Sequence, residues 1–329
     1  MFASPYKRNR RRATVGRRWL GALTLAAMAT GAMAQQVPDT RWWPVVPEPR
    51  HAPGSGPQLC LDEAHHNFHR LEGRFTAFAR LVRADGYRLR GLSESLSTRA
   101  FAGCDILIIA NAQASDIDWD HLPTPSPSAF TTEEVGAVKT WVHSGGALLL
   151  IADHMPFPAA ASALASAFEY HFNDGFAVDD FETEAQGHES FAKPTLFRRE
   201  DGSLAKHVVV DGEKPPYRVT QVRTFTGQAF TAPNHAQPLL VLPDRFVSLM
   251  PDKAWRFNSA SKKIPVGGWL QGALSQEGKG RLAVFGEAGM FTAQVQHSAG
   301  KSVPMGLNAP LAEGNAQFVL NVLGWLASR

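Results

Sequence analysis

Nearly continuous runs of apolar residues alternate with helical patterns through the first half of the chain. The runs Gln58–Leu61, Asp105–Asn111 and Ala147–Ala152 are typical of strands that are covered on both faces of a parallel sheet. Between the first two runs, apolar side chains recur at steps of three and four residues, which predicts a helix; they are Phe68, Leu71, Phe75, Phe78, Leu81 and Val82. A second helix begins with the capping signature Thr131–Glu134 and ends at Gly145. This alternation predicts a doubly wound α/β domain built on a mostly parallel sheet.

Residues 170–265 lose this alternation. They contain short β-like pieces separated by Gly, Pro and polar turns, which predicts a β-rich, antiparallel insertion; the pieces are His207–Val210, Gln221–Phe230 and Pro238–Leu242. Strand and helix patterns then return in Gly268–Leu274, Arg281–Phe285 and Glu313–Ala327. We therefore expect one α/β domain over residues 58–329, preceded by an irregular lead over residues 35–57 that is rich in Pro and Gly.

Composition and charge narrow the class of protein. The 329 residues are 44% hydrophobic and 19% charged, which excludes a disordered tail protein, a collagen-like chain and a polytopic membrane protein. The net charge of +3 comes from 33 Lys and Arg against 30 Asp and Glu. Residues 1–34 hold seven of the basic residues and no acidic one, so the rest of the chain has 26 against 30 and a net charge of −4. Because this part is mildly acidic, we expect no nucleic-acid partner.

The first 34 residues have the three parts of a secretory signal peptide. A basic stretch precedes the apolar run Trp19–Thr30, and Ala32-Met33-Ala34 offers a small-residue cleavage site. The apolar run is too short for a stable membrane anchor. Arg17-Arg18 also resembles a twin-arginine signal, so the sequence leaves the Sec and twin-arginine routes open. We expect a periplasmic or secreted protein that is cleaved near Ala34.

Cys60 and Cys104 are the only cysteines. An oxidising compartment permits one disulfide between them. However, Cys60 is placed near the end of one predicted strand and Cys104 at the start of its neighbour. This separation exceeds the roughly 7 Å between Cα atoms that a disulfide tolerates. We therefore predict two buried free thiols.

Polar clusters follow four of the predicted strands. Asp62–Asn67, Asp153–His154 and Gly286–Gly289 each come directly after a strand, and Asn111 and Gln113 follow the central one. Ligands of open α/β sheets bind beyond the carboxyl ends of the strands, where such loops converge. We therefore expect a shared site here. The alternative is that these loops are polar only because loops are exposed.

The residue types in these clusters suit two chemistries. In the first, a divalent metal lowers the pKa of a bound water, and its predicted ligands are Asp62, His65, His69 and Asp153. In the second, side chains act alone as general acid and base, and the candidates are Glu63, His65, His154 and Glu287. Amides that follow the strands are candidate substrate contacts: Asn67, Asn111 and Gln113. The structural alternative is that the histidines only cap helices and pair with carboxylates; for His66 and His69 we favour it.

Several familiar motifs are absent from the sequence. There is no G-x-S-x-G, which excludes an ordinary serine hydrolase of the α/β-hydrolase type. There is no G-x-x-x-x-G-K-[ST], and no G-x-G-x-x-G follows the first strand, so no nucleotide cofactor is expected.

Four segments resemble a bacterial family of unassigned function. They are DEAHHNFH (Asp62–His69), HSGGALLLIADHMPFP (His143–Pro158), TFTGQAF (Thr224–Phe230) and GEAGMFTAQ (Gly286–Gln294). Members of this family are exported and carry a class I glutamine-amidotransferase-like, flavodoxin-type domain, related in fold to trehalose-utilisation-type domains. The resemblance implies parallel strands with helices on both faces. It does not imply amidotransferase activity, because neither cysteine occupies the strand–helix elbow where those enzymes hold their nucleophile.

Two functional hypotheses follow. The first is an exported, metal-assisted hydrolase of a small polar or glycan-like substrate. The second is a non-catalytic periplasmic module that binds a ligand or acts as a scaffold. The clustering of acid and base side chains favours the first, since a fold alone does not specify a function.

Overall fold

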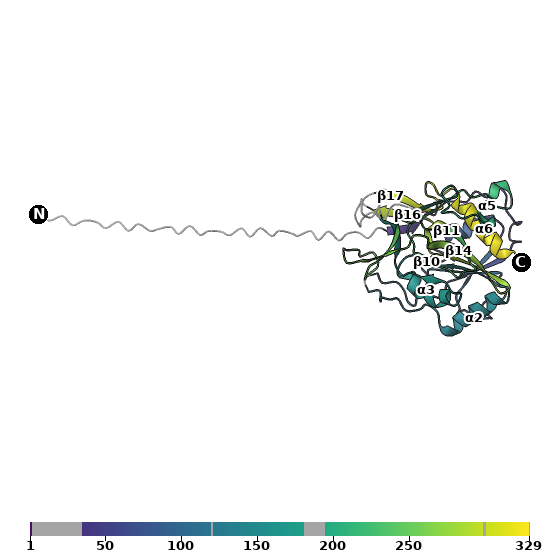
Figure 1. The fold of residues 1–329 in the computed structure, drawn as a ribbon, viewed down its shortest axis with the longest axis horizontal. Helices are drawn as coiled ribbons and strands as arrows, with labels where there is room; N and C mark the ends of the chain where they lie inside the picture. The colour runs from purple at the N-terminus through teal and green to yellow at the C-terminus, as the bar shows by residue number, and fades with distance from the viewer. Residues whose placement is uncertain (2–34, 120, 181–194, 299–300, 329) are drawn as a thin grey trace. The chain divides into compact units, whose positions relative to one another are not determined.

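The computed structural model describes Met1 and residues 35–119, 121–180, 195–298 and 301–328 (Figure 1). The predicted signal peptide over residues 1–34 therefore lies outside the described residues, apart from Met1. Part of the predicted insertion, residues 181–194, also lies outside them. None of the helices in the described ranges is long and apolar enough to cross a membrane.

A nine-stranded sheet forms the centre of the fold. Eight strands run in the order β3 (Arg88–Leu92), β2 (Gln58–Asp62), β4 (Ile106–Ala110), β5 (Ala147–Ile151), β15 (Gly280–Phe285), β14 (Leu270–Glu277), β10 (Phe230–Thr231) and β6 (His171–Phe172). The ninth strand, β11 (Gln237–Val241), also pairs with β14.

The sheet is mixed, so the expectation of a mostly parallel sheet was only partly right. The five strands from β3 to β15 are parallel, but β14, β10, β11 and β6 join by antiparallel pairing. The change of direction occurs at a hairpin, because only Gly278 and Lys279 separate β14 from β15. Gly278 has a φ of +61°, which suits such a tight turn. Two strands joined by a two-residue loop have to be antiparallel.

Helices cover both faces of the sheet. On one face, α1 (Thr76–Ala84) and α6 (Asn315–Ala327) pack in one hydrophobic cluster with alternate strand residues such as Ile108. On the other face, α2 (Thr132–His143) and α3 (Phe157–Ser166) pack with the intervening residues, such as Leu107. This burial on both faces explains why the parallel strands are continuous apolar runs.

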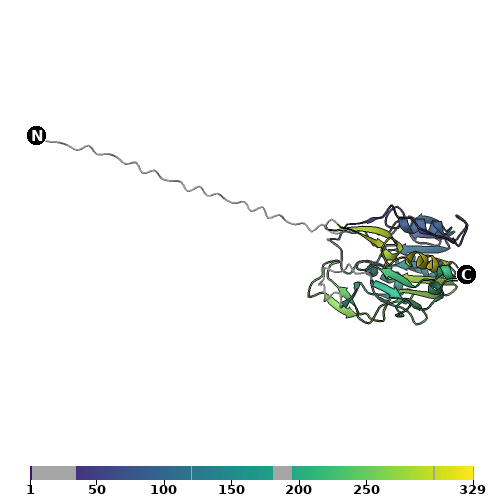
Figure 2. The ribbon, with the colours of Figure 1, turned by 90° about the horizontal axis from the view of Figure 1, so that it is seen from above.

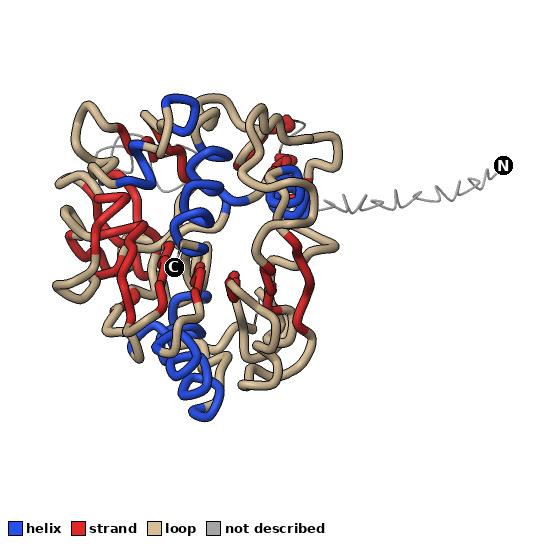
Figure 3. The backbone as a smooth tube through the Cα atoms, turned by 90° about the vertical axis from the view of Figure 1, so that its right-hand side faces the viewer, coloured by secondary structure: helices blue, strands red, loops and turns tan. Residues whose placement is uncertain are grey.

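Three smaller sheets add to the β-rich character. One is β13 (Lys262–Pro265), β12 (Phe246–Met250) and β7 (Phe176–Asp179), and a second is β8 (Thr195–Arg198) with β9 (Gln221–Thr224). The third is β1 (Gln35–Pro38), β16 (Ala293–Ser298) and β17 (Lys301–Gly306). In Figure 2 the blue elements near the start of the described chain and the green β-rich elements lie at opposite sides. Much of the remaining backbone consists of loops, drawn tan in Figure 3.

Two local predictions differ from the structure. The piece His207–Val210 was predicted as β-like, but residues 208–211 form a short helix, α5 (Val208–Asp211). The side chain of His207 caps this helix by accepting a hydrogen bond from the Val209 amide at 3.1 Å. The lead was predicted to be irregular, yet β1 within it pairs antiparallel with β16. A strand of four residues whose pairing partner is distant in the sequence has too little periodicity to be recognised from the sequence alone.

Cys60 and Cys104 form a disulfide bond, with their Cα atoms 5.8 Å apart. The prediction of two free thiols was therefore wrong. It treated Cys104 as the start of the second strand, predicted over Asp105–Asn111, whereas β4 begins only at Ile106. The turn before β4 places Cys104 on the same face of the sheet as Cys60. A carboxylate oxygen of Asp105 accepts a hydrogen bond from the Gln58 amide at 2.8 Å, which ties this turn to the start of β2.

Candidate functional site

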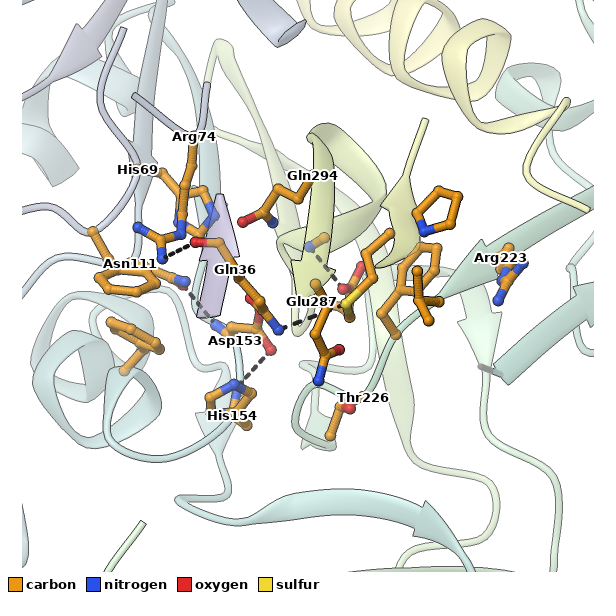
Figure 4. A pocket seen from close by; sticks show the side chains of 18 of the residues that line it. Gln36, His69, Arg74, Asn111, Asp153, His154, Arg223, Thr226, Glu287 and Gln294 are labelled. Atoms are coloured by element: carbon orange, nitrogen blue, oxygen red, sulfur yellow. Dashed lines mark hydrogen bonds between the residues drawn. The ribbon is translucent and has the colours of Figure 1, made fainter. Parts of the chain in front are cut away.

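A pocket of about 440 Å³ lies beyond the carboxyl ends of the parallel strands (Figure 4). Asn111 follows β4 directly, Asp153 comes two residues after β5, and Glu287 comes two residues after β15. All three side chains line the pocket. They come together because parallel strands end at the same edge of a sheet. Aromatic side chains form part of the wall: Phe68, Phe157, Phe225 and Trp255.

Two carboxylates occupy this pocket in different environments. Glu287 is 1% exposed, and its oxygens accept hydrogen bonds from the amides of Gly289 (2.7 Å) and Met290 (2.8 Å). Burial and, after it, the negative charge of Asp153 raise the pKa of Glu287 well above its usual value, although backbone hydrogen bonds oppose the shift. Asp153 is less buried, and it accepts hydrogen bonds from the amides of His154 (2.7 Å) and Ala288 (3.2 Å). The pocket therefore favours the protonated form of Glu287.

His154 is held in place by an aromatic cluster at the same edge. Its ring stacks on Phe176 with centroids 4.7 Å apart, and the Trp255 ring lies at 74° to it with centroids 4.5 Å apart. Nδ1 lies 2.8 Å from the carbonyl oxygen of Met155. Because a carbonyl only accepts, Nδ1 carries the proton and Nε2 is the acceptor nitrogen of the neutral ring. His154 can therefore accept a proton or a hydrogen bond through Nε2.

The backbone is strained around this pocket. Among the described residues, six that are not glycine have a positive φ. Three of these line the pocket, namely Asn111 (+50°), Thr226 (+143°) and Trp255 (+64°). Such conformations cost free energy and concentrate at functional sites.

Buried polar atoms without a partner also concentrate here. Eleven such side-chain atoms occur among the described residues. Five of them belong to residues that line the pocket: Nδ1 of His69, Nε of Arg74, Nδ2 of Asn111, Nε of Arg223 and Oε1 of Gln294. A buried polar atom without a partner is costly, and ligand atoms would satisfy this need. The strain and the unpartnered atoms both identify this pocket as the candidate site.

Several residues that the sequence proposed for the site lie elsewhere. His65 is buried between two carboxylates: Nδ1 lies 2.9 Å from Asp62 and Nε2 lies 2.9 Å from Glu134. Burial would lower the pKa of His65, but the hydrogen bonds and charges of Asp62 and Glu134 raise it overall. Asn67 donates to the same Asp62 carboxylate at 3.0 Å. Both ring nitrogens of His65 are therefore occupied within the protein, and the cluster stabilises a loop.

Glu63 and Gln113 also lie outside the pocket lining. Glu63 accepts a hydrogen bond from the Leu71 amide at 2.7 Å, which fixes the segment before α1. Gln113 is buried, and its backbone amide donates to the backbone carbonyl of His65 at 2.8 Å. The structure thus brings His69, Asn111, Asp153, His154 and Glu287 to one pocket; it places Asp62, Glu63, His65, Asn67 and Gln113 beside it, in the scaffold.

The four predicted metal ligands are divided between these two places. Asp62 and His65 are hydrogen-bonded to each other in the buried cluster outside the pocket, whereas His69 and Asp153 line the pocket. In the part of the chain that the structure describes, no group of three or more His, Cys, Asp or Glu is placed to hold a metal ion. Since protein metal sites usually supply at least three ligands, the residues present do not fit the predicted metal.

The sequence did not identify several pocket residues. Arg74 lies in a turn before α1, and Gln36 lies in β1, within the segment predicted to be irregular. Thr226 and Gln294 were part of the segments that carry the family resemblance, yet neither was considered for the site. That resemblance was the one signal in the sequence that pointed to them.

Comparisons with known proteins show that this chain shares its fold with a solved structure. No family model and no curated protein sequence matches the chain. Among solved structures, the mmIFT52 N-terminal domain is similar, with a TM-score of 0.53 and 13% identity, over 82% of this chain and 98% of that one. A ThuA-like protein from Bacteroides uniformis has a TM-score of 0.43 and 12% identity, over 82% and 90% of the two chains. A cytoplasmic protein from Salmonella typhimurium has a TM-score of 0.45 and 13% identity, over 83% and 100%. Only the first TM-score exceeds 0.5, and at 13% identity it shows a common α/β fold without showing a common activity.

Proposed function

We propose that the pocket binds a small polar, glycan-like molecule and hydrolyses it, with Glu287 as general acid and Asp153 as the charged carboxylate. The observation that carries this proposal is the buried Glu287 carboxyl, whose pKa is raised by burial and by the neighbouring Asp153 carboxylate in the same pocket. Hydrolysis of a glycosidic bond needs one carboxyl group that donates a proton and one that stays ionised. The aromatic wall supports a sugar ligand, because sugar rings pack against aromatic faces.

Each side chain has a defined task in this proposal. Protonated Glu287 donates its proton to the leaving oxygen as the bond breaks. The charge of Asp153 stabilises the positive charge that develops on the sugar, or activates the attacking water. Nε2 of His154 accepts a hydrogen bond from a substrate hydroxyl. Burial of the acid inside the pocket keeps water from competing for its proton.

Binding without catalysis is the second candidate function. Its support is that Glu287 accepts hydrogen bonds from backbone amides through both oxygens, an arrangement that also serves to anchor the turn after β15. In that case the unpartnered polar atoms bind the ligand and the carboxylates only shape the pocket.

One set of variants separates the two functions. The wild type, Asp153→Asn and Glu287→Gln are tested for cleavage of a panel of aryl glycosides and for binding of the free sugars by calorimetry. Glu200→Gln is the matched control, because Glu200 is exposed and lies outside the pocket. For a hydrolase, kcat/KM falls about 100-fold or more in both pocket variants, while Asp153→Asn still binds sugar. Binding by the wild type with no product released would establish the second function instead.

We also propose that the protein is exported to the periplasm or secreted. The signal-like segment at the N-terminus supports this, and so does the Cys60–Cys104 disulfide, because such bonds persist in oxidising compartments. Cell fractionation tests the proposal: the protein is expected outside the cytoplasm, with residues 1–34 removed. The double variant Arg17→Lys/Arg18→Lys blocks export only if the twin-arginine route is used.

A further inference from the structure

The side chains that line the pocket carry more positive than negative charge. Arg74, Arg223 and Lys301 are its cationic residues, and Asp153 and Glu287 are its carboxylates. Three cationic side chains therefore line the pocket with two carboxylates. Burial and the charge of Asp153 raise the pKa of Glu287, which lessens its negative charge further, so an anionic ligand complements the pocket.

Arg74 has no acidic partner among the described residues. Its guanidinium donates to the carbonyl of Gln36 at 3.0 Å and lies 3.9 Å from the centre of the Phe68 ring. Burial lowers the pKa of Arg74, and no carboxylate counters this effect. Arg223 differs, because the nearby charge of Glu313 partly offsets the lowering of its pKa by burial. A partly buried guanidinium without a counter-ion is unfavourable unless a ligand supplies one.

Two further side chains place unpartnered nitrogen atoms at the same end of the pocket. Asn111 is 1% exposed, and its Oδ1 accepts a hydrogen bond from the Asp153 amide at 2.9 Å. This bond fixes the orientation of the amide, so Nδ2 is the group left without a partner. His69 is 3% exposed, and its Nδ1 also has no partner. Burial and then the charges of Arg74 and His154 lower the pKa of His69 to about 3, so His69 is neutral at physiological pH and adds no second cation.

We propose that the end of the pocket formed by His69, Arg74 and Asn111 is an anion subsite, and that the ligand is a small polar molecule with a carboxylate or phosphate group. Arg74 supplies the charge and a planar set of donors that suits either oxyanion. Figure 4 shows these three side chains grouped on one side of Asp153. The sugar-like part of the ligand is taken from the proposed function, on which this inference rests. The charged group of the ligand is what the inference adds. A hexuronate and a sugar phosphate are the two substrate types with this chemistry.

Binding of charged and neutral sugars to the purified protein tests the proposal. Calorimetry compares D-glucuronate, D-glucose 6-phosphate, D-glucose and inorganic phosphate. We expect at least one charged sugar to bind ten times more tightly than glucose or better, with a smaller difference as NaCl rises from about 50 to 500 mM. A preference for glucuronate identifies the carboxylate as the bound group, and a preference for glucose 6-phosphate identifies the phosphate. Inorganic phosphate binding as tightly as glucose 6-phosphate overturns the sugar-like ligand.

Variants of the subsite complete the test. Arg74→Gln is expected to reduce the preference for charged over neutral sugar tenfold or more, and Arg74→Lys to recover part of it. Arg80→Gln is the matched control, because Arg80 lies in α1, contacts Trp43 and stays outside the pocket. Asn111→Asp keeps the size of the side chain but adds negative charge, so it weakens binding of the charged sugar even if Arg74→Gln fails to fold.

Two results overturn the anion subsite: glucose binds as tightly as both charged sugars, or the preference survives in every folded variant of Arg74 and Asn111. These results differ from failure of the hydrolase proposal. If charged sugars bind through Arg74 but no glycoside is cleaved, the subsite stands and the hydrolase falls. If neutral glycosides are cleaved in an Asp153-dependent way and charge gives no advantage, the hydrolase stands and the subsite falls.

Discussion

The amide of Asp153 donates a hydrogen bond of 2.9 Å to Oδ1 of Asn111, and this contact joins the ends of two adjacent parallel strands. It fixes the backbone position of the charged carboxylate and also determines which end of the Asn111 amide is left without a partner. Asn111 makes this contact at a φ of +50°, a conformation that Asn tolerates better than most residues. The carboxylate proposed to act in catalysis and the proposed anion subsite are therefore positioned by one contact.

Replacing Asn111 should separate the cost of its side-chain contact from the cost of its backbone conformation. Asn111→Gly keeps the conformation but leaves the Asp153 amide without its partner, which costs about 1–3 kcal/mol of unfolding free energy. Asn111→Ala adds about 1–2 kcal/mol, because a Cβ is unfavourable at this φ. Urea denaturation of the three proteins measures both differences. Equal stability of the Gly and Ala variants would show that the local backbone relaxes.

The stability of the protein should fall as the pH rises from mildly acidic values, in part through Glu287. Burial and Asp153 raise the pKa of this carboxyl in the folded protein above the value near 4.5 that it starts from. Its contribution to stability is therefore fully present below that starting value and is lost as the pH rises through the folded pKa. Each tenfold increase in the proton affinity of the folded carboxyl corresponds to about 1.4 kcal/mol. Denaturant titrations across this pH range measure the loss for wild type and Glu287→Gln.

Glu287→Gln removes the titrating group, so its unfolding free energy should change less with pH than that of the wild type. A loss of one acceptor for the amides of Gly289 and Met290 lowers its stability at every pH and does not imitate a pH effect. If wild type and variant show the same pH slope, Glu287 does not hold a proton in the folded protein, and its role as general acid fails as well.

The sequence predicted the part of the fold that local patterns determine. Continuous apolar runs located β2, β4 and β5, because burial on both faces leaves no polar position in these strands. The antiparallel half was harder to predict. Strands β10 and β6 have two residues each, too few for any periodicity, and their partners are distant in sequence.

In the site, too, local patterns identified some residues, and contacts between distant parts of the chain decided the others. The rule that ligands bind beyond strand ends placed Asn111, Asp153 and Glu287 in one pocket. It failed for His65 because the partner that occupies its Nε2 is Glu134, 69 residues away. Arg74 lies within the stretch Phe68–Val82 that was predicted as a helix, but the structure has a turn there and α1 begins only at Thr76. Nothing in the sequence connected Arg74 to the pocket.

His65 should act as a scaffold residue. His65→Ala leaves Asp62 and Glu134 buried without their shared partner, which is expected to cost about 3–5 kcal/mol of unfolding free energy. The matched control is His121→Ala, because His121 also contacts a carboxylate but is exposed; it should change stability by less than about 0.5 kcal/mol. Denaturation at fixed pH measures both effects. A stable His65→Ala protein that has lost sugar hydrolysis would instead return His65 to the catalytic candidates.

The pH dependence of this variant gives a second check. Asp62 and Glu134 outweigh burial and raise the pKa of His65 above 6.5. Its charged form therefore stabilises the protein fully below the unfolded pKa, and this stabilisation is lost as the pH rises through the folded pKa. The difference in stability between wild type and His65→Ala should then be larger at pH 6 than at pH 9. A difference that grows with pH would contradict a charged His65 between the two carboxylates.

Removal of the Cys60–Cys104 disulfide should destabilise the protein without altering the pocket. The bond joins residues 44 positions apart, and a cross-link that closes a loop of this length stabilises a protein by up to about 4 kcal/mol in the chain-entropy description. Both cysteines lie outside the pocket lining, so ligand affinity should not change. Urea denaturation of the wild type and of Cys60→Ala/Cys104→Ala, each with and without dithiothreitol, measures the effect. The reductant should lower the midpoint of the wild type towards that of the double variant and leave the variant unchanged. If the two proteins unfold at the same urea concentration under oxidising conditions, the cysteines are not bonded in solution, and the support that this bond gives to export is lost.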